Sequence, residues 1–114
     1  MARINTKSAK QKGRLGQDAV RQMILDAFPE FTEEDIKTAI MGEKGDDIKL
    51  SPQAKEKIPL AIEVKRRKSF KLLYDFIEQA DRKDGRNPVV FLRGDRQPWL
   101  VILKADYFME LIKK

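Results

Sequence analysis

Hydrophobic residues in the first quarter of the chain recur at three- and four-residue spacing, the period of a helix with one buried face. They predict an amphipathic helix over residues 11–28 that ends at Pro29. Thr32 is followed by three acidic residues, the usual form of an N-cap with acids in the first turn, and predicts a short helix over residues 33–39. The hydrophobic residues of the first helix are Leu15, Ala19, Val20, Met23, Ile24, Ala27 and Phe28.

The middle of the chain alternates polar and hydrophobic residues, the period of a strand with one buried face. Two strands are expected, over residues 46–50 and 60–65, joined by a short helical turn over residues 51–57 that begins with a Ser-Pro pair. In an antiparallel pair of these strands, Asp47 lies opposite Glu63, so the two carboxylates are neighbours.

The second half of the chain predicts a helix, two strands and a final helix. A hydrophobic face at helical spacing covers residues 69–83, and the turn-forming residues 84–88 end it. Two hydrophobic strands are expected over residues 89–92 and 99–103, and a last helix after Asp106. The full order, α, short α, β, β, α, β, β, α, is typical of an α/β sandwich.

The 114 residues leave room for one compact domain with one hydrophobic core. We expect residues 1–10 to be a basic, flexible tail and residues 11–114 to be a single domain. Cysteine and histidine are both absent, which excludes disulfides, thiolate nucleophiles, Ser-His triads and the usual zinc sites. No hydrophobic run approaches the roughly 20 residues that span a bilayer, and the amino terminus has no hydrophobic signal segment. A cytoplasmic protein without membrane contact is therefore expected.

The net charge is +6 and is unevenly distributed along the chain. An acidic stretch over residues 30–47 separates two basic blocks, one before residue 15 and one after Glu63. Two cationic blocks around an acidic centre are typical of a protein that binds a polyanion and holds a cation in its middle. We therefore expect a polyanion such as a nucleic acid to be the partner, bound by Lys10, Lys12, Arg14, Lys44, Arg66, Arg67, Lys68 and Lys71.

Hydrolysis of a phosphodiester needs an activated water and relief of the phosphate charge, which Mg²⁺ held by carboxylates supplies. Asp47 and Glu63 are the expected ligands, with the backbone carbonyl of Val64 as a third. Lys65 shares a strand face with Glu63, where its ammonium group can orient the water and stabilise negative charge. Acid-x-Lys triplets occur at three other places in the chain. This triplet differs from them because it ends a hydrophobic strand and a basic segment follows it.

The arrangement resembles the PD-(D/E)XK nuclease superfamily, and within it the small phage-encoded, resolvase-like members. In such families the acids of two neighbouring strands bind the metal and the lysine acts in catalysis, roles that match Asp47, Glu63 and Lys65. A glutamine on the next helix often supports the site and matches Gln79. The resemblance covers most of the chain and is carried by Lys12-Gly13-Arg14, Met41-Gly42, residues 45–52, residues 62–65 and Glu78-Gln79-Ala80.

Two features depart from the family pattern. Many relatives carry a glutamate on the first helix, where this chain has Gln17 followed by Asp18, so a contribution of the first helix stays open. The proline before the first motif acid is also missing, at a position that varies widely in the superfamily.

The resemblance implies a fold, an activity and an assembly. The fold is a small restriction-endonuclease-like α/β sandwich, with a central mixed four-stranded sheet flanked by helices. The activity is Mg²⁺-dependent cleavage of DNA, with Mn²⁺ as a substitute and with selectivity for Holliday-type or other branched junctions. Resolving a junction needs two active sites, so a homodimer is expected, with the exposed ends of the last strands and helix as its interface. A phage-encoded protein would act in the cytoplasm of the host cell.

Other interpretations fit parts of the same sequence. Glu63 and Lys65 could be a solvated strand face, although two acids opposed across a strand pair are unfavourable without a cation between them. The chain could bind DNA as a non-catalytic accessory protein, although its Asp, Glu and Lys set is intact. It could be a sequence-specific nicking or homing enzyme, for which its size leaves little surface for base readout. Gln79 fits a plain helix surface equally well, and Trp99 fits a core or dimer interface better than base stacking.

Overall fold

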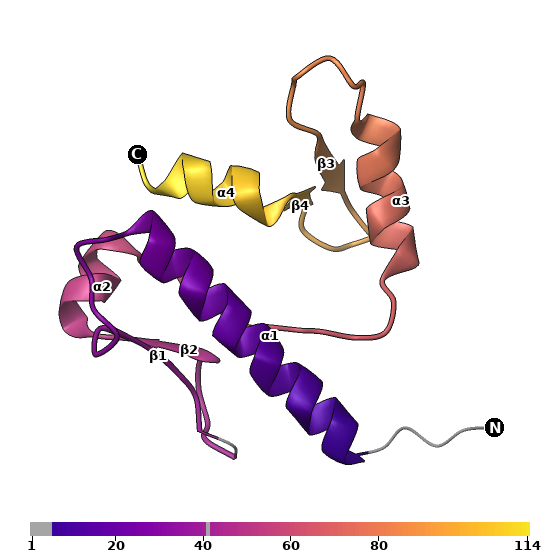
Figure 1. Ribbon diagram of the computed structural model, residues 1–114. Coiled ribbons are helices and arrows are strands. Elements are labelled where there is room, and N and C mark those ends of the chain that lie inside the picture. The colour runs from indigo at the N-terminus through magenta and orange to yellow at the C-terminus, as the bar shows by residue number, and fades with distance from the viewer. Residues whose placement is uncertain (1–5, 41) are drawn as a thin grey trace. The chain divides into compact units, whose positions relative to one another are not determined.

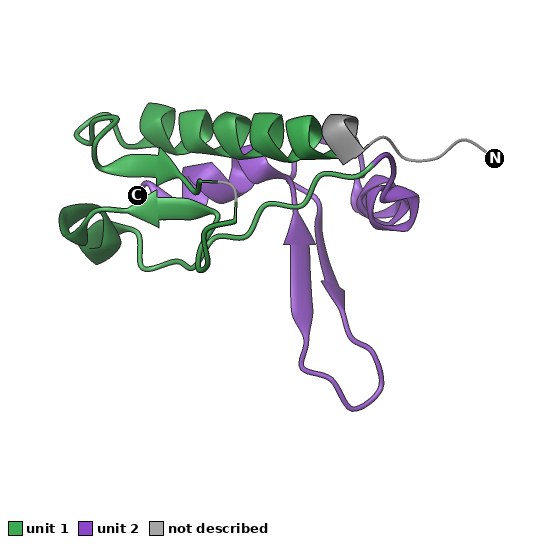
Figure 2. Cartoon of the chain, turned by 90° about the horizontal axis from the view of Figure 1, so that it is seen from below, with its two compact units in different colours: residues 1–67 green, residues 68–114 purple. Residues whose placement is uncertain are grey.

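The computed structural model describes residues 6–40 and 42–114, and of residues 6–8 only the backbone (Figure 1). Met41, which carries part of the family resemblance, lies outside the described residues. The chain divides into two compact units, unit 1 over residues 1–67 and unit 2 over residues 68–114 (Figure 2). Each unit combines helices with one small antiparallel sheet, so the fold is mixed α/β. The expectation of one domain over residues 11–114 stays a prediction.

The longest element is helix α1, Thr6–Ala27. It begins five residues earlier than predicted, within the stretch of residues 1–10 where a flexible tail was expected, and residues 1–5 lie outside the description. The helix ends before Pro29 as expected, because proline cannot continue the backbone hydrogen bonds. Its hydrophobic face is buried at the carboxyl end, where Ile24 is 3% exposed and the adjoining Phe28 1% exposed.

The predicted helix over residues 33–39 is wrong, because strand β1, Ile36–Thr38, forms there and pairs antiparallel with β2, Ile48–Leu50. The N-cap at Thr32 correctly indicated a turn, but the prediction continued this turn into a helix that does not form. The Asp35 carboxylate accepts the backbone N–H and the hydroxyl of Thr32, which closes one turn. The next residue, Ile36, is completely buried in the strand. Burial of this β-branched side chain therefore decides the conformation after the turn.

The predicted strand over residues 60–65 is also wrong, although its alternation is right. Helix α2, Pro52–Lys57, forms where the short helical turn was expected. After α2, the Leu60 N–H donates back to the carbonyl of Ile58 at 2.8 Å. Pro59 has no N–H to donate. The segment therefore begins in a tight turn and not in the hydrogen-bond ladder of a strand pair. Ile62 and Val64 are half-buried while their neighbours are exposed, as an extended segment with one inward face requires.

Unit 2 consists of helix α3, Lys71–Ala80, the hairpin of β3, Val89–Leu92, and β4, Leu100–Leu103, and helix α4, Ala105–Ile112. These elements confirm the predicted helix, two strands and final helix, with helix ends moved by up to three residues. The helix α3 packs against the β3–β4 hairpin. Among the described residues the strands form two separate two-stranded sheets, so the predicted central four-stranded sheet is not confirmed.

The fully buried hydrophobic side chains of the described residues all belong to unit 1. They come from α1, β1, β2, α2 and the residues that follow these helices, and they fix the framework around the start of β2. None of the described helices has the length and hydrophobicity needed to cross a membrane. The buried set is Ile24, Phe28, Ile36, Ile48, Ala54 and Ile58.

Candidate functional site

Asp47 lies at the start of β2, where three segments of unit 1 meet. Its carbonyl accepts the N–H of Ala39, just after β1, at 2.9 Å, and its own N–H donates to the carbonyl of Ile62 at 3.0 Å. Its carboxylate Oδ2 accepts the N–H of Val64 at 2.7 Å. Asp47 is half-buried, and no described residue bonds to its Oδ1. One carboxylate oxygen is therefore fixed, and within the described part of the chain nothing occupies the other.

Glu63 lies between the two residues that Asp47 holds. Because Asp47 bonds to both Ile62 and Val64, the predicted proximity of Asp47 and Glu63 does not depend on a regular strand pair. The Glu63 side chain is 60% exposed, and its Oε2 lies 3.3 Å from Nζ of Lys65, which is 66% exposed. The structure thus brings the three predicted residues into one region of unit 1, with an acid and an ammonium group on one side of the 62–65 segment.

A cavity of about 260 Å³ opens beside Asp47. One face of α1 contributes positions 10, 13, 14 and 17, which follow the three- and four-residue spacing of a helix face. The β1–β2 hairpin supplies the opposite wall. The cavity combines carboxylates with a lysine and an arginine, a composition suited to a cation beside a phosphate. The lining residues are Lys10, Gly13, Arg14, Gln17, Ala39, Ile40, Gly42, Glu43 and Asp47.

Glu43 is an acid of this cavity that the sequence analysis did not single out. Its Oε1 accepts the N–H of Ile40 at 2.8 Å, and its Oε2 lies 3.4 Å from Nζ of Lys49. The backbone N–H of Ile40, and to a lesser degree Lys49, holds the pKa of Glu43 below its ordinary value. Both oxygens are occupied within the hairpin, so Glu43 stabilises the turn. In the sequence, Glu43 is only an acid between two turn glycines, and this pattern does not distinguish a turn-stabilising acid from a metal ligand.

Gln17 also lines the cavity, although the sequence analysis left its contribution open. The signal that could have found it is periodicity, because Lys10, Arg14 and Gln17 fall on one face of a helix that begins at Thr6. Asp18, the next residue, is exposed and is not part of the lining.

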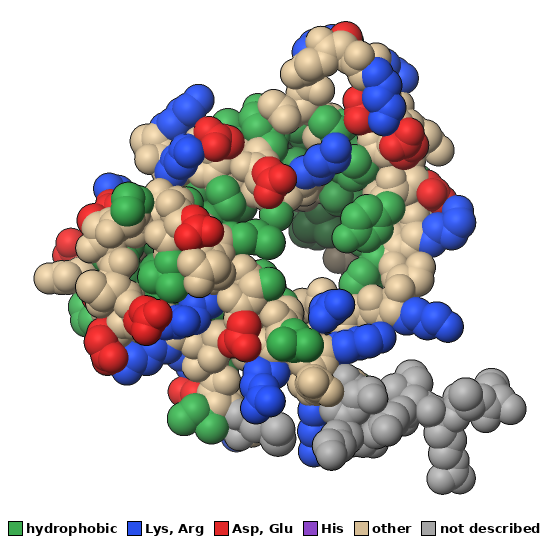
Figure 3. Space-filling view, in the orientation of Figure 1, with side chains coloured by type: hydrophobic (Ala, Val, Ile, Leu, Met, Phe, Trp, Pro, Cys, Tyr) green, Lys and Arg blue, Asp and Glu red, His purple; other side chains and the backbone are tan. Residues whose placement is uncertain are grey.

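The predicted DNA-binding residues of unit 1 divide into two groups. Lys10 and Arg14 line the cavity, whereas Lys12 and Lys44 are exposed and do not line it. Arg66 lies against α1, where a Cβ at Gly16 would be 3.4 Å from the Arg66 Cβ. In Figure 3 the blue Lys and Arg side chains gather along the amino-terminal half of α1. These positions form a cationic surface next to Asp47.

The other predicted site residues lie at the end of unit 1 or in unit 2. Arg67 is exposed at the end of unit 1, and Lys68 is exposed at the start of unit 2. Lys71 pairs with Asp75 at 2.7 Å on α3, which neutralises part of its charge. Gln79 is exposed on α3, so its predicted support of the Asp47 site stays a prediction, as does a ligand role for the Val64 carbonyl.

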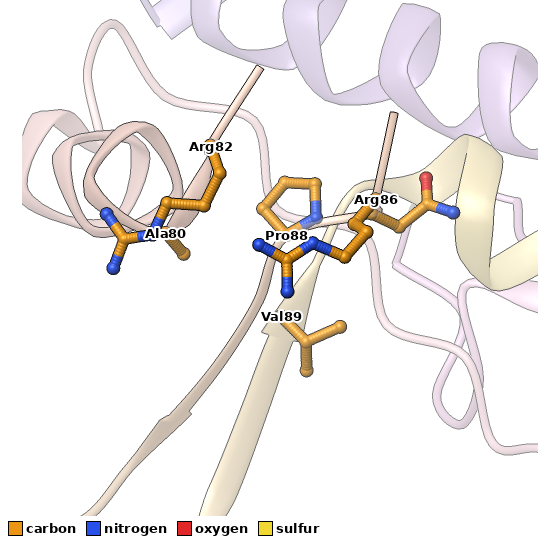
Figure 4. A pocket seen from close by; sticks show the side chains of 6 residues that line it. Ala80, Arg82, Arg86, Pro88 and Val89 are labelled. Carbon is orange, nitrogen blue, oxygen red and sulfur yellow. The ribbon is translucent and has the colours of Figure 1, made fainter. Parts of the chain in front are cut away.

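Unit 2 has a cavity of its own, also about 260 Å³, lined by Arg82, Arg86 and Asn87 over a hydrophobic floor (Figure 4). Arg86 donates from Nε to Asp84 at 2.9 Å, and this contact holds the pKa of Asp84 below its ordinary value. Arg82 donates to the carbonyl of Gln79 at 3.0 Å. No carboxylate lines the cavity, so its chemistry suits an anion and not a metal ion.

The carboxylates near Asp47 set what metal the site can hold. Among the described residues no group of three or more acids gathers that could hold a metal ion, so metal binding by the two carboxylates of Asp47 and Glu63 stays a prediction. Two carboxylates fit Mg²⁺, which keeps several waters and needs few protein ligands, better than Ca²⁺, which takes six to eight oxygens. Comparison with known proteins gives no match to any family model, curated protein or solved structure.

Proposed function

We propose that the chain is a metal-dependent DNA endonuclease of the PD-(D/E)XK type that hydrolyses phosphodiester bonds. One observation carries the proposal: Asp47 bonds to the residues on both sides of Glu63, and Glu63 pairs with Lys65. These bonds support the proposal because they hold the 62–65 segment against Asp47, although α2 separates the two segments in sequence. The cationic cavity wall of Lys10 and Arg14 beside Asp47 supports a polyanionic substrate.

Asp47 and Glu63 would hold Mg²⁺, with the Val64 carbonyl as a further ligand. When bound, Mg²⁺ would supply charge relief at the phosphate and a more acidic water. The protein's part is orientation: the Val64 N–H fixes Asp47 Oδ2 and leaves Oδ1 open. Lys65 would donate from Nζ to the attacking water or to a phosphate oxygen. Its pairing with Glu63 is exposed, so little free energy is lost when the lysine turns to the substrate.

DNA would lie along the amino-terminal half of α1, where Lys10 and Arg14 contact phosphates. Phosphate contacts position the protein on the DNA but do not recognise the base sequence. The proposed preference is therefore for DNA structure, including Holliday-type and branched junctions. Homodimerisation, the supporting role of Gln79 and the use of Mn²⁺ in place of Mg²⁺ belong to the same proposal.

The test is a cleavage panel with labelled junction, duplex and single-stranded DNA, each with and without Mg²⁺ or Mn²⁺. Wild-type protein is expected to cut only with the metal. Glu63→Gln and Lys65→Met are each expected to lower the rate by at least about 100-fold while DNA binding by gel shift persists. Lys55→Gln, an exposed lysine on α2, is the matched control and should cut at the wild-type rate. Wild-type cutting by either site variant would overturn the site assignment.

A second candidate function is DNA binding without cleavage. It is favoured by the ion pair between Glu63 and Lys65, which satisfies both groups without a metal, and by the lack of a third acid among the described residues. The same panel separates the two functions. Tight, salt-sensitive binding with no product on any substrate and with either metal would establish the accessory protein and contradict the nuclease.

A further inference from the structure

The segment that joins α3 to β3 places two arginines in one cavity, the cavity of unit 2 shown in Figure 4. Its volume is about 260 Å³, and all of its lining residues belong to unit 2. Arginine and amide side chains meet non-polar ones there, and none of the lining residues is acidic. The lining residues are Ala80, Arg82, Arg86, Asn87, Pro88 and Val89, of which Pro88 is buried.

Arg82 is held by one hydrogen bond that leaves most of its donors unused. Its Nη1 donates to the carbonyl of Gln79, in the last turn of α3, at 3.0 Å. Its Nε and Nη2 bond to no described residue, and no described carboxylate pairs with it. The N–H groups of Nε and Nη2 are parallel, the arrangement with which arginine binds two oxygens of a phosphate or a carboxylate. Arg82 therefore has an oriented guanidinium group whose charge is not neutralised.

Arg86 is oriented by the carboxylate of Asp84, which does not line the cavity. Its Nε donates to Oδ2 of Asp84 at 2.9 Å, and its Nη2 lies 2.8 Å from the same oxygen. The other oxygen of Asp84 accepts the backbone N–H of Arg86 at 3.2 Å. In Figure 4 the Arg86 side chain extends towards Pro88 and Val89. Nη1, at the end of this side chain, bonds to no residue that the structure describes.

The turn between the two arginines is fixed by its own side chains. Lys83 has a φ of +55°, and Asp81 holds it there by accepting its backbone N–H at 2.9 Å. The ammonium group of Lys83 lies 3.2 Å from Asp81 and 3.4 Å from Glu78. These two acids therefore take up the charge of Lys83 and not that of Arg82. Because the turn holds the arginines in place before any ligand arrives, less conformational entropy is lost on binding.

We propose that this cavity binds a phosphate group through Arg82 and Arg86, with Asn87 as a further donor. A phosphate has more acceptor oxygens than a carboxylate and can use two guanidinium groups at once. The non-polar side chains of the lining can contact the group that carries the phosphate. A free phosphate ester and the backbone of a nucleic acid offer the same oxygens. The site is independent of the nuclease proposal, because its residues all belong to unit 2 and Asp47 does not.

The test is a titration of the full chain with inorganic phosphate, followed residue by residue by amide NMR at constant ionic strength. The N–H signals of Arg82, Arg86 and Asn87 are expected to shift and to saturate. Chloride in place of phosphate should leave these three signals nearly unchanged. The absence of a saturable shift in them would overturn the proposal, whatever happens to the signals of unit 1.

Arg82→Gln supplies the directed test, with Arg93→Gln as its matched control. Arg93 also donates to a loop carbonyl, that of Gln97, at 2.8 Å, but it does not line the cavity. Arg82→Gln is expected to raise the phosphate Kd at the site by at least about 10-fold, because charge-assisted hydrogen bonds are lost. Arg93→Gln should bind as the wild type does. An equal loss in both variants would contradict the site, and the wild-type titration decides the question even if Arg82→Gln does not fold.

A mononucleotide and a short single-stranded oligonucleotide identify the carrier of the phosphate. If the carrier is a nucleic acid, the oligonucleotide should shift the Arg82, Arg86 and Asn87 signals at lower concentration than the mononucleotide does. If it is a free ester, the mononucleotide should be the tighter ligand. Either order supports the phosphate site. Wild-type affinity of both ligands for the same three residues in Arg82→Gln would overturn it.

Discussion

Asp35 and Asp47 show how the backbone N–H groups around a carboxylate determine its role. The Asp35 oxygens accept from Thr32 and from the Ser51 hydroxyl at 2.8 Å, so both are occupied. Asp47 uses one oxygen for the Val64 N–H. Asp35 is therefore a structural residue that joins the turn before β1 to the start of α2. Asp47 is the acid with coordinating capacity left.

The acid sensitivity of unit 1 is predicted from Asp35. The backbone N–H of Thr32 and then the Ser51 hydroxyl hold its pKa below the ordinary value in the folded protein. Because the pKa of Asp35 is lower in the folded than in the unfolded protein, its ionised carboxylate stabilises the fold at pH values above the unfolded pKa, about 4. This stabilisation is lost as the pH falls through the folded pKa. Asp35→Asn should lower the melting temperature at pH 7, and this effect should shrink as the pH falls below about 4 and through the folded pKa. A pH-independent difference would contradict this role.

Ser51 gives a second prediction at the residue scale. Its hydroxyl caps α2 by accepting the N–H of Ala54 at 3.2 Å and donates to Asp35. Ser51→Ala should lower the free energy of unfolding by about 1 kcal/mol in urea titrations. Gln53→Ala is the control, because Gln53 is exposed on α2 and does not cap it. An equal loss in both variants would refute the capping role.

Single residues were only partly predictable from the sequence. Alternation predicted that Asp47 would lie next to the 62–65 segment, which the bonds of Asp47 to Ile62 and Val64 confirm, while contact between the Asp47 and Glu63 carboxylates stays a prediction. The role of Glu43 could not be predicted, because its partners, Ile40 and Lys49, meet it only once the β1–β2 hairpin has formed. Asp35 was taken as an acid of a helix turn for the same reason: its partner Ser51 is 16 residues away.

Helix α1 positions the cavity wall, and two of its glycines can be compared directly. A Cβ at Gly13 would meet no atom within 4 Å, whereas at Gly16 it would meet Val64 and Arg66 at 3.4 Å. Gly13→Ala should raise the free energy of unfolding by up to about 1 kcal/mol, because alanine favours the helix. Gly16→Ala should gain less because of the closer contact. Chemical denaturation measures both, and destabilisation by Gly13→Ala would contradict a regular helix at this position.

Elements with strong periodicity or clear end signals were predictable, and those that depend on distant pairing were not. The helices α1 and α3 and the β3–β4 hairpin follow from local spacing, with Pro29 ending the hydrophobic face of the first. By contrast, β1 replaced a predicted helix because β2 pairs with it through Ile36 and Leu50. The segment after Pro59 does not form the predicted strand, because the N–H of Leu60 donates to the carbonyl of Ile58. Tertiary contacts overrode local preference in both places.

At the scale of the whole molecule, charge governs the proposed binding of DNA. The net charge is +6, and Lys10 and Arg14 flank the cavity beside Asp47. We predict that the affinity for duplex DNA falls steeply with salt. The double variant Lys10→Gln/Arg14→Gln should lower the slope of log affinity against log salt by about two. Lys37→Gln/Lys55→Gln, which removes the same charge from lysines that do not line the cavity, should leave the slope nearly unchanged. Equal effects would indicate nonspecific attraction to net charge.

The central claim is a metal ion bound between Asp47 and Glu63, and a Mn²⁺ titration followed by electron paramagnetic resonance tests it most directly. Asp47→Asn and Asp46→Asn form a matched pair, because the two acids are adjacent and half-buried while Asp46 bonds to no described residue. We predict one Mn²⁺ site in the wild type and in Asp46→Asn. The affinity of that site should be at least about 10-fold weaker in Asp47→Asn and in Glu63→Gln. Wild-type binding by Asp47→Asn, or an equal loss in Asp46→Asn, would contradict the account.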